Sequence, residues 1–228
     1  PKQWNLDNYR EVLDRMNFGR YMLNTVFVTA VTTVVQTFFC AITAYGFARL
    51  RFPGAGQMFF CFLCLVMVPS QMLMIPRYVM MVNFKWIDSY LALIMPHYVS
   101  IYGTFLLRQY FMALPKELEE AARIDGSGEF HTFNHVVLPI MKPALAVQAI
   151  FTFVASWNNY FVPALILTSN KKKTLPILIA QLRSADFLKF DMGQVYMLIA
   201  IAIMPVIIIY LFLSKFIVAG VALGGVKG

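Results

Sequence analysis

The chain has 228 residues, of which 60% are hydrophobic and 13% are charged, and its mean hydropathy is +0.67. Soluble globular domains are nearer half apolar and a quarter charged, so this composition excludes an ordinary water-soluble domain. The net charge of +8 does not indicate a nucleic-acid-binding protein, because most basic residues flank apolar runs instead of forming one patch.

Five long runs contain no Asp, Glu, Lys or Arg. A helix needs roughly 20 residues to cross a hydrocarbon core of ~30 Å, and each run is long enough. The sequence therefore predicts an all-α polytopic membrane protein, with a single transmembrane domain over residues 21–228. The expected transmembrane helices cover residues 22–47, 56–77, 89–110, 144–168 and 194–216.

The segment before the first expected helix, residues 1–20, mixes Trp, Leu and Tyr with Asp, Arg and Glu. This pattern is typical of a short helix that lies at a membrane interface. Cysteines occur only within expected helices, and Cys61-x-x-Cys64 lacks the second ligand pair of a zinc site. We therefore interpret the cysteines as small packing residues. His97, inside the third expected helix, is interpreted as a packed and hydrogen-bonded side chain.

Basic residues do not decide the orientation of the chain. The segments at the helix ends on the side of the Arg49–Arg51 turn carry eight basic residues, and the segments at the opposite helix ends carry eleven. The count mildly favours the second side as cytoplasmic, whereas the short Arg49–Arg51 turn favours the first, because short loops weigh most in the positive-inside rule. Charge counting leaves both orientations open.

A charged insert separates the third and fourth expected helices, and its segment 117–143 holds five acidic and two basic residues. Pro115 followed by acidic residues predicts the start of a short helix. Asp125-Gly126 predicts its end, because Gly readily adopts the left-handed conformation found there.

A second short helix is expected after Ser127, broken at Leu138-Pro139, with Pro143 opening the next span. The two helices would lie at the membrane surface, where small Ala residues beside Glu119 and Glu120 allow a partner carrying Arg or Lys to approach. From the residues alone, an ordinary loop with solvated charges remains an alternative.

The fourth expected helix contains an unusual polar and aromatic cluster. Buried amides require hydrogen-bond partners, which neighbouring helices could supply. The alternative is a cavity face on which amides bind sugar hydroxyls and an aromatic ring stacks on the sugar. The cluster consists of Trp157, Asn158, Asn159 and Tyr160.

The next loop, from Thr168 to Gly193, carries three consecutive lysines at positions 171–173. A solvated charge run is one interpretation, and attraction of an anionic substrate is the other.

Chemistry-bearing motifs are absent from the sequence. There is no GxxxxGK[ST] phosphate-binding loop, so the chain is not expected to hydrolyse ATP, and no catalytic constellation occurs. His131 and His135 have a helical spacing but no third ligand, so no metal site is expected. The expected spans also lack the ionisable groups typical of ion-coupled transporters. Energy must then come from a partner.

The spacing within the insert resembles the EAA loop of permeases from ATP-binding-cassette (ABC) importers. In this sequence it comprises Glu120-Ala121-Ala122, three residues, Gly126, nine residues, Val136, one residue and Leu138-Pro139. The one departure is Val136, where Ile is usual. Residues 44–54, AlaTyrGlyPheAlaArgLeuArgPheProGly, and 220–228, GlyValAlaLeuGlyGlyValLysGly, are similar to the maltose-type, carbohydrate-uptake branch of these permeases.

The resemblance implies a permease subunit in the inner membrane of a bacterium, with the insert (112–143) and the tail (217–228) in the cytoplasm and residues 1–20 outside. The insert would be the coupling helix of an importer for a carbohydrate, and the fourth span would line the path through the cluster named above. The coupling residues implied are Glu119, Glu120, Ala121, Ala122, Asp125, Gly126, Leu138 and Pro139, and those of the tail are Gly224, Gly225, Lys227 and Gly228.

The implied partners are a second permease subunit, two ATP-binding subunits that hold ATP and Mg, an external substrate-binding protein and the lipid bilayer. No cofactor and no nucleic acid are expected for this chain itself. Family members have six spans, so we also expect a first helix to be missing. Three alternatives stay open: a secondary transporter or channel, an intramembrane enzyme, and a permease for an anion of the glycerol-phosphate type.

Overall fold

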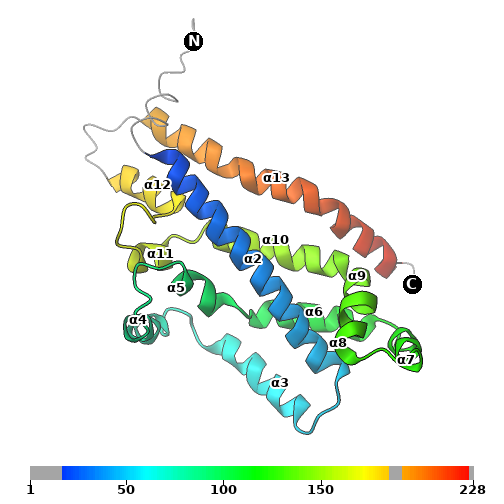
Figure 1. The fold of residues 1–228 in the computed structure, drawn as a ribbon. Coiled ribbons are helices and arrows are strands. Elements are labelled where there is room, and N and C mark those ends of the chain that lie inside the picture. Colours follow the sequence, from blue (N-terminus) through cyan, green and yellow to red (C-terminus); the bar gives the residue numbers. More distant parts are fainter. Residues whose placement is uncertain (1–16, 185–191, 226–228) are drawn as a thin grey trace, which may run out of the picture. The chain divides into compact units, whose positions relative to one another are not determined.

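The computed structural model describes residues 17–184 and 192–225. The described residues form helices and contain no strand, which confirms the all-α prediction (Figure 1). Short 3-10 turns lie at Leu65–Met67 and Met95–His97, and a π-helical turn, η3, lies at Phe133–Val137. The α-helices are α2 (Phe18–Arg49), α3 (Ala55–Cys64), α4 (Met74–Asn83), α5 (Leu91–Ile94), α6 (Ile101–Ala113), α7 (Glu117–Ile124), α8 (Glu129–Thr132), α9 (Leu138–Ile140), α10 (Lys142–Trp157), α11 (Phe161–Ile166), α12 (Leu175–Ser184) and α13 (Met192–Gly225).

Within the described residues, two helices are long and apolar enough to cross a membrane, Phe18–Arg49 and Val195–Phe216. A third candidate is the pair Glu129–Ile140 and Lys142–Trp157, which is bent by 82°. The expectation of continuous helices over 56–77, 89–110 and 144–168 is therefore wrong. The number of membrane passes stays a prediction.

Local chemistry explains the three breaks. Val68 is extended (φ −82°, ψ 114°) because it precedes Pro69. Ser100 ends the second interruption as the N-cap of α6 and accepts the N–H of Gly103 at 3.1 Å. At the third, the Asn158 amide donates to the Val154 carbonyl at 2.9 Å and competes with the helix for it.

The chain divides into two compact units. One holds the described residues up to Thr33 together with Met74–Pro96 and Phe153–Tyr210. It contains two apolar clusters, one around Phe153, Trp157 and Leu198 and another around Ile166 and Leu93. Helices α2, α10 and α13 each contribute residues to both units.

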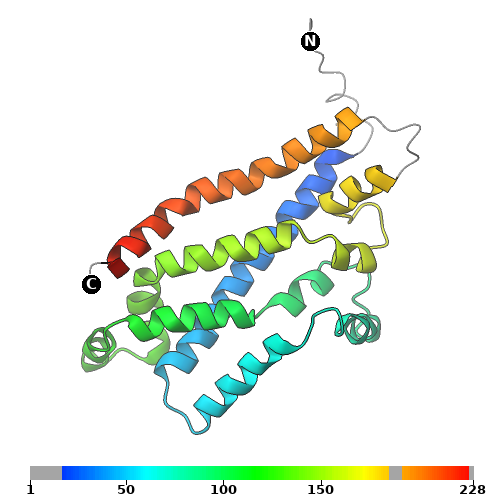
Figure 2. The ribbon, with the colours of Figure 1, turned by 180° about the vertical axis from the view of Figure 1, so that it is seen from behind.

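The other unit comprises Val34–Leu73, His97–Thr152 and the described residues from Leu211. Its core packs part of α2 against α6, η3 and the start of α10, and α6 runs beside α10 (Figure 2). Buried members of this core are Cys40, Ala41, Ala44, Tyr45, Leu107, Phe111, Phe133, Val137, Met141 and Ala144.

A buried polar network lies in the same unit and satisfies the backbone at the break before α6. Gln148 Nε2 donates to Thr152 Oγ1 at 3.1 Å, and Thr152 Oγ1 donates to Gln36 Oε1 at 2.6 Å. Gln36 Nε2 in turn donates to the backbone carbonyl of His97 at 2.6 Å. The Ser100 N–H donates to Cys40 Sγ at 3.2 Å.

Many large apolar side chains remain exposed, including Met67 (83%), Leu23 (70%) and Phe212 (66%). A surface of this kind requires lipid or a partner to cover it. Cys61 and Cys64 belong to it, so the packing interpretation holds for the buried Cys40 and is wrong for these two.

Candidate functional site

The insert folds as two short helical segments. Helix α7 begins at Glu117 and carries three acidic residues in its first turn. The positive end of the helix dipole stabilises their negative charges there. It ends at Ile124 with Asp125 as its C-cap, and Gly126 has a φ of +81°. The predicted start, stop and left-handed glycine are confirmed.

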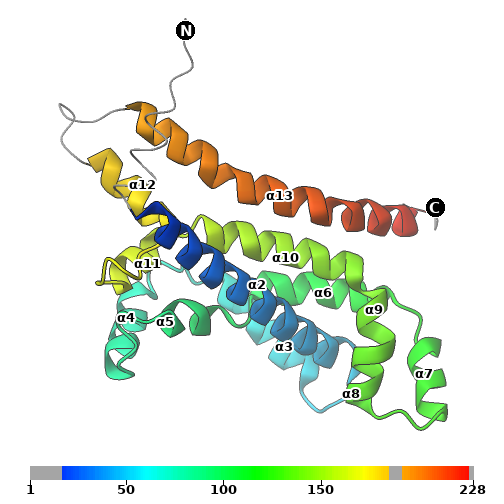
Figure 3. The ribbon, with the colours of Figure 1, turned by 45° about the horizontal axis from the view of Figure 1, so that its top comes forward.

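The second segment runs from Glu129 through α8, η3 and α9 to Ile140, and α7 lies beside it (Figure 3). The expected break at Leu138-Pro139 is wrong, because the helix continues and turns at Met141 before α10. Pro139 has no backbone N–H to donate, and two features accommodate it. It lies in the first turn of α9, and it directly follows a π-helical turn, in which the hydrogen-bond pattern is already wider than in an α-helix.

The two adjacent acids of α7 have opposite surroundings. Glu119 is buried, with 6% of its surface exposed, whereas Glu120 is exposed. Glu119 Oε1 lies 3.0 Å from Arg49 Nε, and the two side chains are 8% and 3% exposed. The Nε–H of Arg49 does not point at Glu119 Oε1 closely enough for a hydrogen bond, so we describe this contact as an ion pair.

Arg49 is the last residue of α2, and its Nη2 also donates to the carbonyl of Leu114 at 2.6 Å. The Arg49 guanidinium therefore contacts Leu114, just before α7, and Glu119, in the first turn of α7. Burial raises the pKa of Glu119, and the Arg49 guanidinium opposes that shift. Sequence reasoning missed Arg49 as a site residue, although a lone cation at the end of a long apolar run was the available signal.

A polar hollow of about 700 Å³ lies between the end of α2 and the insert. Charged side chains of both signs line it, and two of them, Arg123 and Glu129, are paired at 2.6 Å on its exposed side. The remaining charged residues in the lining are Arg49, Arg51, Lys116, Glu119 and Glu120. A hollow of this volume and polarity is large enough to hold a polar or charged side chain.

The predicted coupling residues fall into two groups. An outer group, Glu120, Ala121, Asp125, Gly126 and Pro139, is exposed. An inner group consists of Glu119, which is buried, and Ala122 and Leu138, which are half-buried. Near the outer group lie the exposed apolar side chains of Leu118 (39%), Ile124 (87%) and Phe130 (67%). Exposed apolar residues among charges are typical of a protein-docking surface.

The predicted path residues surround the end of α10. Trp157 is buried, donates its indole N–H to the Ala202 carbonyl at 3.0 Å and stacks on Phe153 with ring centroids 5.5 Å apart. Asn158 and Tyr160 are exposed. Together with Trp157 they border a cavity of about 630 Å³ whose other walls are apolar residues of α12 and α13. Asn159 is half-buried and does not line this cavity.

The remaining predicted positions are peripheral. Gly224 and Gly225 form the last turn of α13, which extends further than the predicted tail boundary allows. Lys227 and Gly228 lie outside the described residues, as does most of the segment 1–20. His131 and His135 are exposed and stack with ring centroids 4.0 Å apart. Across the described ranges, no group of three His, Cys, Asp or Glu residues could hold a metal ion.

Comparison with known proteins identifies the family to which the chain is similar. The family described as the binding-protein-dependent transport system inner membrane component matches residues 36–222. The chain is 37% identical to the arabinooligosaccharides transport system permease protein AraQ of Bacillus subtilis, covering 100% of this chain and 81% of that protein. It is 30% identical to the maltodextrin transport system permease protein MdxG of the same species, covering 99% and 81%.

A solved structure shares the fold. It is a crystal structure of a bacterial ABC transporter involved in the import of the acidic polysaccharide alginate, with a TM-score of 0.84 and 25% identity over 92% of this chain and 79% of that one. The chain belongs to the family of binding-protein-dependent transport system inner membrane components. It is a membrane transport subunit and not an enzyme, and the family implies a binding protein and an ATPase as partners.

Proposed function

We propose that this chain forms half of the translocation path of an importer for an oligosaccharide or related carbohydrate, in a bacterial inner membrane. The cargo class is supported by the similar permeases, which are named for arabinooligosaccharide, maltodextrin and diacetylchitobiose transport. A second permease subunit would form the other half. Two ATP-binding subunits would bind ATP and Mg, and an external binding protein would deliver the sugar.

The observation that carries this proposal is the division of the insert into a buried and an exposed face. Glu119 anchors α7 through Arg49, while Glu120, Ala121 and Ile124 face outward. A helix held from within and exposed on its far side transmits force as a rigid lever. ATP-driven closure of the ATPase subunits would move α7, and the anchored spans would follow.

In this proposal Glu120 binds a basic residue of the ATPase, and Ala121 permits close approach because its side chain is small. Gly126 sets the angle between α7 and the second segment, since φ +81° is open to Gly without strain. The end of α13, with Gly224 and Gly225, would reach the ATPase subunits as well.

The cavity beside Trp157 is the proposed contact with the sugar. Asn158 offers an amide, and Tyr160 offers an exposed ring that can stack on a sugar face. Trp157 supports the wall, because its indole is buried and already bonded to Ala202. Asn159 remains assigned to the path by sequence alone.

The test is purification of the chain in a mild detergent from its native membrane, followed by identification of stoichiometric partners. We expect an ATP-binding subunit and a second multi-span protein to copurify. A chain recovered alone, whose uptake activity follows an ion gradient and not ATP, would overturn the proposal in favour of secondary transport.

A further inference from the structure

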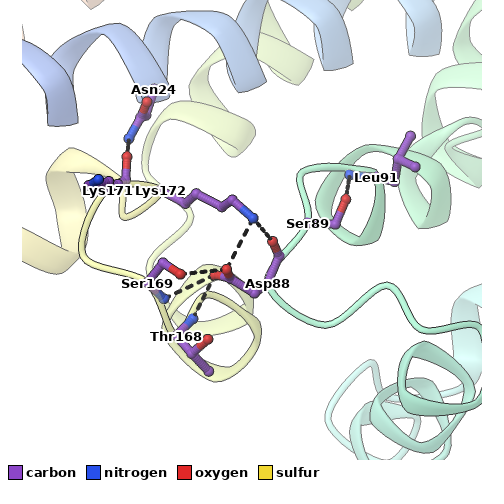
Figure 4. Close-up of polar contacts among 8 residues, drawn as sticks. All are labelled: Asn24, Asp88, Ser89, Leu91, Thr168, Ser169, Lys171 and Lys172. Atoms are coloured by element: carbon purple, nitrogen blue, oxygen red, sulfur yellow. Dashed lines mark hydrogen bonds and ion pairs between the residues drawn. The ribbon is translucent and has the colours of Figure 1, made fainter.

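Asp88, in the loop between α4 and α5, binds the segment that joins α11 to α12 (Figure 4). Its Oδ1 accepts the backbone N–H groups of Thr168 at 3.1 Å and Ser169 at 3.0 Å. Its Oδ2 accepts the Ser169 hydroxyl at 2.6 Å and pairs with Lys172 Nζ at 3.0 Å. The Asp88 N–H donates to the Ile166 carbonyl at 3.0 Å, and Lys172 Nζ also donates to the Asp88 carbonyl. Asp88 therefore holds the start of this segment through both its side chain and its backbone.

Asp88 has a backbone conformation that is uncommon for a residue with a side chain, with φ at +57°. A residue stays in this conformation only when its surroundings hold it there, and such residues cluster where function requires a fixed geometry. The Ser169 hydroxyl and backbone N–H hold the pKa of Asp88 well below its usual range, and Lys172 adds to that shift. The carboxylate is therefore charged at neutral pH.

Asn24 of α2 binds the other end of the same segment. Its Nδ2 donates to the carbonyls of Lys171 and Lys173, each at 2.9 Å. We call residues 168–174 the clasped segment, because Asp88 binds its start and Asn24 binds its end. Two elements that are distant from it in the sequence, the α4–α5 loop and α2, therefore restrain its backbone.

The clasped segment leads directly into a wall of the cavity beside Trp157. Helix α12 begins at Leu175, whose N–H has no acceptor within its own helix and donates to Thr25 Oγ1 of α2 at 2.8 Å. Leu175 also packs in the same apolar cluster as Trp157. All of these residues lie in one of the two compact units. The residues of α12 that line the cavity are Leu175, Pro176, Ile179 and Ala180.

The position of this wall depends on what holds α12 at its start. The helix has only 10 residues, and a helix of this length owes its stability to contacts outside itself. A binding site also needs its walls held to within about 0.5 Å of the productive geometry. The bonds at both ends of the clasped segment supply that restraint. Without them α12 would shift, and the cavity would change shape.

We propose that Asp88 is a positioning residue that, together with Asn24, fixes the start of α12 and thereby the shape of the sugar cavity beside Trp157. This inference rests on the proposed function, because it takes that cavity as the contact with the sugar. Asp88 itself does not line the cavity and acts through the backbone of the clasped segment. Asp88 therefore helps to determine which sugars the cavity accepts.

The first measurement reports the position of α12. Ile179→Cys is introduced into a chain whose two exposed native cysteines are replaced by Ser, and its labelling by a water-soluble maleimide is followed in the importer assembled in lipid nanodiscs. Asp88→Ala and, separately, Asn24→Ala are expected to raise the labelling rate about threefold, because each frees one end of the clasped segment and lets α12 open locally. Asp88→Asn keeps an oxygen acceptor and tolerates a positive φ, so its rate should stay within about 1.5-fold of the wild-type rate.

The second measurement is the choice among sugars, which a loss of stability alone would not alter. Proteoliposomes that hold the importer are supplied with its binding protein and a mixture of malto- and arabino-oligosaccharides, and the imported sugars are identified by mass spectrometry. Asp88→Ala is expected to change the ratio between the two most imported chain lengths about threefold, because the displaced wall no longer excludes the poorer fit. Asp88→Asn is expected to keep the wild-type ratio.

Ser89→Ala is the matched control, since Ser89 neighbours Asp88 but its hydroxyl accepts the nearby Leu91 N–H at 3.2 Å instead of binding the clasped segment (Figure 4). It is expected to match wild type in both measurements. An assembled Asp88→Ala importer with an unchanged labelling rate or an unchanged sugar ratio would overturn the proposal. If Asp88→Ala does not assemble, Asn24→Ala decides by the same two measurements. A wild-type importer that takes up no member of the mixture would instead contradict the proposed function, so the two failures are distinguishable.

Discussion

Arg49 and Glu119, 70 residues apart in the chain, form a buried ion pair at 3.0 Å that joins the end of α2 to helix α7 of the insert. Both side chains are almost fully covered, so neither charge can be solvated if the other is lost. In the proposed importer, this pair would make α7 move with α2, the helix that ends beside it. The proposal therefore puts the pair on the mechanical link between ATP hydrolysis and transport.

Arg49→Met is expected to destabilise the protein by about 3–5 kcal/mol, because it leaves Glu119 as an uncompensated buried charge. The unfolding temperature of the purified complex should fall, and ATP hydrolysed per sugar imported should rise. Arg51→Met, in the same turn but exposed, is the control for stability and should leave the unfolding temperature unchanged. Adding Glu119→Leu to Arg49→Met should recover most of the lost stability. Equal losses from Arg51→Met would show that the buried pair is not responsible.

The stability of Arg49→Met should depend on pH. Without the guanidinium, burial raises the pKa of Glu119 further above its unfolded value. The folded state then holds a proton that the unfolded chain releases, so stability falls as pH rises through the shifted pKa. The difference in unfolding temperature from wild type should narrow as pH is lowered from about 8 to about 5.5. The double variant with Glu119→Gln has no carboxyl there, and its difference should be independent of pH.

Gly126→Ala should uncouple the importer without blocking membrane insertion. A side chain at φ +81° is strained by about 1–2 kcal/mol, although the space around Gly126 is open. The angle between α7 and the second segment should change, so uptake should fall while ATP hydrolysis continues. Gly128→Ala is the matched control, because Gly128 has a φ of −72° and open space. Uptake that survives both Gly126→Ala and Glu120→Ala would contradict the coupling role.

Gly103→Ala should loosen the contact between α6 and α10. A Cβ at this position would lie 2.3 Å from Gln148 Nε2, so Gln148 must move and its bond to Thr152 must break. The expected loss is about 1–3 kcal/mol, measured as a lower unfolding temperature in detergent. Gly46→Ala, in the long helix α2 with nothing within 4 Å, should be neutral or stabilising. Equal effects at the two positions would refute the contact as the cause.

Asn158→Ala and Trp157→Phe should separate a sugar contact from a structural one. Asn158 is exposed at the cavity, and its bond to the Val154 carbonyl is exposed as well, so its loss should raise the KM for sugar and lower the unfolding temperature by less than Trp157→Phe does. Trp157→Phe removes the indole donor from the Ala202 carbonyl and should cost about 1 kcal/mol of stability. A KM unaffected by Asn158→Ala would remove this side chain from the path.

The membrane class and the local form of the insert could be predicted from the residues alone. Hydrocarbon tolerates only apolar, helical segments, so composition and charge-free runs indicated the class directly. The start of α7 after Pro115 and its end at Gly126 depend on the φ preferences of single residues, which need no tertiary information. The EAA spacing could be recognised for the same reason, since it lies within one short stretch of the sequence.

Which charged side chains meet could not be predicted from the sequence, because it depends on how the helices pack. Glu119 and Glu120 are identical neighbours in the sequence, and only packing against α2 buries the first and exposes the second. Arg49 contacts Glu119, which is 70 residues away, and local sequence patterns carry no information over that separation. The helix break before α6 was equally hidden, because the His97 carbonyl there accepts from Gln36 of α2, which is 61 residues away in the chain.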